Sequence, residues 1–204
     1  VNVANNAPFS GATTATLNIS PLSTALNGYV FQVIVSGVPC GAVTSNTATL
    51  TANALPVVVL TAASYSSITP SIRTTLYTTV STPGSYTYQW YRDGILVPGL
   101  TADRFAVTVD DLGTYDVTVT NTVTGCSSNK SNRVEIDFAV SGELFIYPNP
   151  TSGQFQVRYL SYANNISRTL NVYDSKGARV YSKQYTTSGP YSSMDVNLEN
   201  AASD

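Results

Sequence analysis

An internal repeat limits the folds that are open to this chain. When the sequence is shifted by 86 residues without gaps, six residues fall on identical ones. The matched pairs are Leu26 with Leu112, Tyr29 with Tyr115, Val33 with Val119, Cys40 with Cys126, Ser45 with Ser131 and Asn46 with Asn132. Self-similarity at this spacing indicates two consecutive copies of one domain.

Both copies show the alternation of apolar and polar residues that is typical of half-buried strands. In the second copy the inward positions are Phe105, Val107 and Val109, then Tyr115, Val117 and Val119, then Val134 and Ile136. Turn residues separate these segments. Ser and Thr supply 51 of the 204 residues, and the branched side chain of Thr suits a sheet surface. The sequence therefore predicts an all-β protein.

The second copy carries the features of one recognisable sandwich. Tyr86, Tyr88 and Trp90 share one face of a strand, and Asp111-x-Gly113-x-Tyr115 follows. This combination resembles the immunoglobulin-like β-sandwich, in which the tyrosine forms a corner with the preceding loop. Val117 stands where such a domain has its second cysteine, and Leu76 is a candidate for the first position. We therefore predict a complete immunoglobulin-like domain at residues 55–138, held together by packing alone.

The first copy is shorter. The equivalent of Pro56, where the second copy begins, falls about 30 residues before Val1. We therefore expect residues 1–54 to be the C-terminal part of an immunoglobulin-like domain. Cys40 and Cys126 occupy equivalent places in different domains, so they lie too far apart for a disulfide. We expect free thiols, or Cys40 paired to the preceding segment.

The last 66 residues, 139–204, differ in composition from the rest of the chain, because they hold seven of the 14 tyrosines and five of the ten basic residues. They begin with a strand that ends in Tyr147-Pro148-Asn149-Pro150-x-x-Gly153, and further on carry Tyr173-Asp174-x-x-Gly177-x-x-Val180. Short alternating strands are predicted around these motifs. We predict a third, small β-sandwich here.

These two motifs, in this order, resemble the type A C-terminal sorting domain of the bacterial type IX secretion system. The resemblance implies a Bacteroidota protein that is secreted or attached to the cell surface, with tandem immunoglobulin-like domains ahead of its export signal. It also implies two partners, the outer-membrane translocon and the surface-attachment machinery, with the outer membrane crossed only through the translocon. The family pattern closes with a Gly-x-Tyr strand and a short basic strand, whereas this sequence stops at Asp204. We therefore expect the last strands of the domain to be absent.

The motifs also supply the candidate recognition residues. Two prolines restrict φ and hold their neighbours extended, so Tyr147 and Asn149 would be presented in nearly one conformation. In the alternative interpretation, Tyr-Pro-Asn-Pro merely ends a strand and starts a turn. The candidate set for signal recognition is Tyr147, Pro148, Asn149, Pro150, Gly153, Asp174 and Gly177.

Composition argues against several other functions. Ten basic and 12 acidic residues give a net charge of −2, which offers no surface for nucleic acid. The chain has no histidine, which removes the usual catalytic bases and zinc ligands, so we expect neither an enzyme nor a cofactor or metal. Calcium binding by Asp110, Asp111 and Asp116 is disfavoured, because the spacing fits no calcium loop and Arg104 is a candidate partner for these acids.

Two alternatives remain open at this stage. The immunoglobulin-like domains could belong to an adhesin, as in surface attachment or gliding motility, and bind a glycan or surface, with Tyr91 the best-placed exposed aromatic residue. The chain could also be the tail of an enzyme whose catalytic domain lies upstream. A spacer carrying an export signal is the interpretation we favour.

Overall fold

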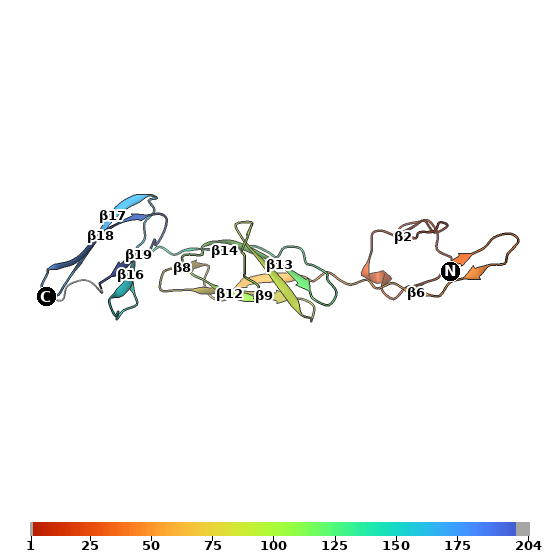
Figure 1. Ribbon diagram of the computed structural model, residues 1–204, viewed down its shortest axis with the longest axis horizontal. Helices are drawn as coiled ribbons and strands as arrows, with labels where there is room; N and C mark the ends of the chain where they lie inside the picture. The colour runs from red at the N-terminus through yellow and green to blue at the C-terminus, as the bar shows by residue number, and fades with distance from the viewer. Residues whose placement is uncertain (1, 199–204) are drawn as a thin grey trace.

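Three β-rich units lie in a row along the long axis of the molecule, in sequence order (Figure 1). The structure is a computed structural model that describes residues 2–198. We refer to residues 2–54, 55–138 and 139–198 as the first, second and third units. Within the described range, the helical element is a single turn, η1 (Thr24–Leu26). The prediction of an all-β protein is confirmed.

Among residues 2–198, no helix has the length and apolar character that crossing a bilayer requires.

The second unit is a sandwich of two sheets. One sheet has the order β12-β9-β7 and the other the order β11-β10-β13-β14-β8. The strands are β7 (Val58–Ala62), β8 (Ser67–Ile68), β9 (Thr74–Val80), β10 (Tyr86–Arg92), β11 (Ile95–Leu96), β12 (Arg104–Val107), β13 (Gly113–Asn121) and β14 (Val134–Phe138). The opening segment serves both sheets, since β7 pairs antiparallel with β9 and β8 pairs parallel with β14. This is the arrangement of an immunoglobulin-like sandwich.

The core of this unit forms as its motifs predict. Trp90 is fully buried and its indole N–H donates to the carbonyl of Ala102 at 2.9 Å. The Tyr115 hydroxyl donates to the carbonyl of Asp111, which is the predicted tyrosine corner. Leu76 and Val117 are both 0% exposed and belong to the same apolar cluster. Packing thus replaces the disulfide at these two positions.

Within residues 2–54, the first unit has counterparts of the later strands of the second unit, beginning with β1 and β2 in the places of β11 and β12. Its strands pair only as β1 with β2, β3 with β6 and β4 with β5. They are β1 (Phe9–Ser10), β2 (Asn18–Ile19), β3 (Val30–Phe31), β4 (Ile34–Val35), β5 (Val43–Thr44) and β6 (Ala48–Thr49). Its buried apolar residues within the described range are Leu26 and Ala52. Residues 2–54 therefore contain no closed sandwich, and their assignment to part of a larger domain stays a prediction.

Hydrogen bonds correct the repeat in one strand. Ser45 donates its N–H to the carbonyl of Val33 at 2.9 Å, while its hydroxyl accepts from the N–H of Val33 at 3.0 Å. Ser131 makes the same two bonds with Val117, at 2.9 and 3.1 Å. Val33 is thus equivalent to Val117 and not to Val119, so the ungapped match of 86 residues is wrong by two in this strand.

The third unit packs a sheet on a hairpin. The sheet has the order β15-β16-β19, and β17 pairs with β18. The strands are β15 (Phe145–Tyr147), β16 (Gln154–Arg158), β17 (Ile166–Tyr173), β18 (Arg179–Thr187) and β19 (Met194–Asn197). Val157, Met194 and Val196 form the core between them. The prediction of a small β unit holds, while the expected loss of its last strands concerns positions outside the described residues.

Both cysteines are free thiols, with Cys40 exposed and Cys126 partly covered. Pairing of Cys40 to a preceding segment, the other expectation, stays a prediction. Neither thiol adds to the packing described above.

Candidate functional site

The first motif of the third unit ends a strand and forms an exposed loop. Tyr147 is the last residue of β15, and residues 148–153, here called the proline loop, lead into β16. Pro148, Asn149 and Pro150 are all exposed. Within the loop the Thr151 hydroxyl accepts from the Gly153 N–H at 3.1 Å and donates to the carbonyl of Gln154. The loop is therefore closed locally and presents its prolines and Asn149 outward.

Gly153 has a backbone role in this loop. Its φ is 119°, in the region that L side chains rarely adopt. Its carbonyl accepts from the N–H of Leu198 at 2.7 Å, next to the pairing of β16 with β19. A glycine is therefore needed where the proline loop enters the sheet.

The second motif is the turn of the β17–β18 hairpin. Residues 174–177, the hairpin turn, are all exposed. One carboxylate oxygen of Asp174 accepts from the N–H of Lys176 at 2.9 Å and of Ala178 at 2.7 Å. Gly177 has a φ of 83°, which favours glycine. Asp174 and Gly177 thus fix the shape of the turn.

Strand registers place both segments at one end of the third unit. Gln154 of β16 pairs with Asn197, and the opposite end of β16 reaches Arg158, which contacts the second unit. β17 and β18 likewise have their hairpin turn at one end and the buried Thr187 at the other. Tyr191, four residues after Thr187, belongs to the same apolar cluster as Trp90 of the second unit. The proline loop and the hairpin turn therefore lie at the end away from the second unit, here called the distal end.

The two segments are brought to one end without bonding to each other. Among the described residues, no hydrogen bond or ion pair joins residues 148–153 to residues 174–177. Any ligand that touches both would therefore have to bridge them.

Tyr147 differs from the predicted exposed recognition residue. Its side chain is partly buried against the apolar cluster, and its ring centroid lies 5.9 Å from the guanidinium carbon of Arg158. Burial raises the pKa of Tyr147, and the positive charge of Arg158 opposes that rise. Tyr147 is thus partly buried and Asn149 is exposed, and a recognition role for either residue stays a prediction.

Sequence reasoning missed Arg158, which is buried in the interface between the second and third units. Its guanidinium binds both carboxylate oxygens of Asp110, at 2.6 and 2.9 Å. Burial disfavours its charge, but the bonds and charge of Asp110 outweigh this and raise the pKa of Arg158. The only sequence signal was an arginine within the apolar alternation of β16, which predicts no partner.

The acidic residues considered for calcium are dispersed among different cations. Asp116 lies 2.8 Å from Lys130, and Asp111 lies 3.5 Å from Arg92. Arg104 pairs with its neighbour Asp103 at 3.0 Å, so its expected role as partner of the cluster is wrong. Across residues 2–198, no group of three His, Cys, Asp or Glu side chains is placed to hold a metal ion.

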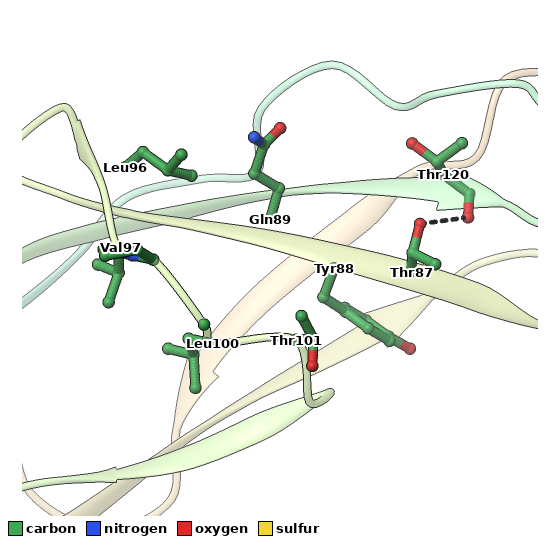
Figure 2. A pocket seen from close by; sticks show the side chains of 10 residues that line it. Thr87, Tyr88, Gln89, Leu96, Val97, Leu100, Thr101 and Thr120 are labelled. Carbon is green, nitrogen blue, oxygen red and sulfur yellow. Dashed lines mark hydrogen bonds between the residues drawn. The ribbon is translucent and has the colours of Figure 1, made fainter.

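A shallow hollow of about 350 Å³ lies beside β10 and β11 and is the candidate ligand site of the second unit. Figure 2 shows that Thr87, Gln89 and Thr120 lie on one side of the β10 ribbon, and Tyr88 and Leu100 on the other. The lining side chains therefore do not converge on one point. This geometry is unlike that of a binding pocket, in which polar groups are aimed at a common ligand.

The ring of Tyr91, the aromatic residue considered for glycan binding, already contacts a neighbouring side chain. The ammonium of Lys130 lies 3.7 Å from the centroid of its ring, and the same ammonium pairs with the buried Asp116. One face of the ring is thus covered by a cation–π contact.

Comparison with known proteins identifies the third unit. Residues 145–202 match the family described as the secretion system C-terminal sorting domain. No curated protein matches the chain. Among solved structures, the human OSCAR ligand-binding domain is 19% identical over 73% of this chain and 86% of that one, with a TM-score of 0.37, too low to support an inference.

The matched region contains the proline loop and the hairpin turn, the two features on which the resemblance was first noted. Domains of this family mark proteins that are exported across the outer membrane, to the cell surface or the medium. The immunoglobulin-like sandwich ahead of it follows from its own strand order and tyrosine corner. The C-terminal unit of this chain is a type IX secretion system sorting domain.

Proposed function

We propose that the type IX translocon binds the third unit at its distal end, through the proline loop and the hairpin turn. The observation that carries this proposal is that two motifs separated in sequence reach the same exposed end of the unit. One partner can therefore contact both motifs at the same time. The surface-attachment machinery is the second partner we propose.

The chemistry of the two segments suits recognition of shape. Prolines at 148 and 150 restrict the backbone on both sides of Asn149. One carboxylate oxygen of Asp174 accepts hydrogen bonds from two backbone N–H groups of its own turn. Both segments are thus ordered before any partner arrives, so little conformational entropy is lost on binding.

The units ahead of the sorting domain act as a spacer, and the chain works by binding and delivery without bond chemistry. The absence of histidine in the sequence supports this, because the common general base is missing. Their surfaces are rich in Ser and Thr, which solvate a sheet without a charged patch.

The test is export of the full-length protein in a bacterium that has a type IX system. Replacing Pro148, Asn149 and Pro150 together by Ala frees the loop backbone and removes the exposed amide. The variant is expected to accumulate in the periplasm. Immunoblots of surface, medium and periplasmic fractions measure the exported share.

A matched control carries Pro98→Ala, which alters another exposed proline in the second unit. Its export should equal that of the unmodified protein. Circular dichroism of each purified variant shows whether the third unit still folds. Unchanged export of a correctly folded loop variant would remove the proline loop from the proposal.

An adhesin whose second unit binds a glycan or a surface is the alternative function. It has less support, because Lys130 covers Tyr91 and the hollow beside β10 lacks convergent side chains. A glycan array probed with residues 55–198 tests it, and binding that is lost in Tyr88→Ala would favour the adhesin. An enzyme domain upstream is compatible with either function, since a sorting domain does not determine what kind of protein it exports.

A further inference from the structure

One buried arginine crosses from the third unit to the second. Arg158 is 5% exposed, and its two terminal nitrogens bind the two oxygens of Asp110 side by side. The same guanidinium donates to the carbonyl of Tyr191 at 3.1 Å. A paired fork of this kind fixes direction as well as distance, because both bonds are kept in only one relative orientation of the groups.

An apolar contact lies beside the buried Arg158, while the Asp110 side chain is 61% exposed. Tyr191 is fully buried, and its hydroxyl donates at 2.7 Å to the carbonyl of Ala139, which directly follows β14 and whose N–H donates to the carbonyl of Ile68 in the second unit. Its ring meets that of Phe145 edge-on, with centroids 5.6 Å apart. Phe145 and Tyr191 belong to the same apolar cluster as Trp90 of the second unit. The core of the immunoglobulin-like domain therefore continues into the sorting domain.

A second aromatic pair closes the edge of this contact. Phe138, the last residue of β14, packs edge-on against Tyr162 of the third unit at 5.9 Å between centroids. Contacts thus lie on both sides of the connection at residues 139–144. Hinge motion at this connection would separate the apolar surfaces and leave Arg158 without its partner, which is costly for a buried charge.

The pair also reaches the recognition motif. Arg158 lies over the ring of Tyr147, the residue from which the proline loop starts. Asp110 itself follows β12 and lies next to Asp111, whose carbonyl receives the tyrosine-corner bond. A continuous set of contacts therefore runs from the corner of the immunoglobulin-like domain to the base of the proline loop.

We propose that Asp110 of the immunoglobulin-like domain is a positioning residue of the export signal, which holds the sorting domain in one orientation so that the two units reach the translocon as a single rigid body. The orientation directs the distal end away from the cargo. The second half of this inference rests on the proposed function, and the first half does not.

The first test measures tumbling of the purified full chain by ¹⁵N NMR relaxation. Amides of the second and third units should share one rotational correlation time. Asp110→Asn keeps the size of the side chain but removes its charge, and should give the third unit a shorter correlation time than the second. The combined variant Asp110→Arg with Arg158→Asp reverses the pair and should restore shared tumbling.

Asp103→Asn serves as the control, since it removes an acid that is paired at an exposed position within the second unit. It should leave tumbling unchanged. Trp90 fluorescence reports whether the second unit stays folded in each variant. Independent tumbling in the unmodified chain would overturn the rigid coupling, and shared tumbling in Asp110→Asn would overturn the positioning role of Asp110.

The second test measures export of the same variants in the bacterium. Asp110→Asn should lower the exported share, the reversed pair should recover it, and Asp103→Asn should match the unmodified protein. If the proline-loop variant blocks export while Asp110→Asn does not, the positioning role is wrong and the recognition role stands. If neither variant affects export, the proposed function fails, while the tumbling result still decides the rigid coupling.

Discussion

The first and second units share one sequence pattern, but equivalent side chains are exposed in the first unit and buried in the second. Val33 and Val117 make the same pair of bonds with Ser45 and Ser131. Yet Val117 is 0% exposed and Val33 is 54% exposed. The local hydrogen bonds are therefore independent of whether a second sheet covers the strand.

The difference lies in how equivalent strands pair. In the second unit, β11 pairs with β10 and β12 pairs with β9. Their counterparts in the first unit, β1 and β2, pair with each other. The alternation of a strand thus sets which face is apolar, while its neighbours decide whether that face is buried.

The largest expected effect comes from the equivalent valines. Val117→Ala should destabilise the second unit by about 2–3 kcal/mol, because it removes two buried methyl groups and leaves a cavity. Val33→Ala should change the first unit by less than about 0.5 kcal/mol. Hydrogen exchange measures each unit separately. Equal losses in both would show that the first unit has a closed core.

Asparagine provides the next comparison. The amide of Asn132 binds both the N–H and the carbonyl of Leu60, at 2.9 Å each. Its counterpart Asn46 makes no side-chain hydrogen bond within residues 2–198. Asn132→Ala should cost about 1–2 kcal/mol, since Leu60 is buried and loses both partners, and Asn46→Ala should be neutral. Chemical unfolding followed by Trp90 fluorescence measures the first, and hydrogen exchange the second.

The smallest effect concerns the tyrosine corner. Tyr115→Phe removes the bond to the Asp111 carbonyl and should cost about 1 kcal/mol. In the first unit the equivalent position already holds Phe31, two residues before Val33. Phe31→Tyr should bring no gain there. A stabilisation of the first unit by this change, detected as slower hydrogen exchange in β3, would mean that it forms a corner of its own.

The sequence was most informative where one motif determines one local bond. Trp90 and Tyr115 were assigned correctly, because the indole and hydroxyl each need a partner once buried. The equivalence of Val33 was misplaced, because a shift of two residues keeps every side chain on the same face and preserves the alternation. Periodicity alone cannot detect such a shift.

The candidate site was partly accessible in the same way. Asp174, Gly177 and Gly153 could be found because turns restrict residue type. The contact of Tyr147 with Arg158 could not, since Arg158 is held by Asp110, which is 48 residues away in the sequence. A single long-range ion pair leaves no periodic trace.

The parallel pairing of β8 with β14 has a mechanical consequence. The chain reaches β8 through β7, which pairs antiparallel with β9, and leaves the unit after β14. The two chain ends of the β8–β14 pairing therefore lie at opposite ends of this ladder. Tension between the two ends would load the bonds from Asp137 to Ser66 and from Ala139 to Ile68 in shear. Bonds loaded in this way must break together, whereas a hairpin pulled at its open end unzips one bond at a time.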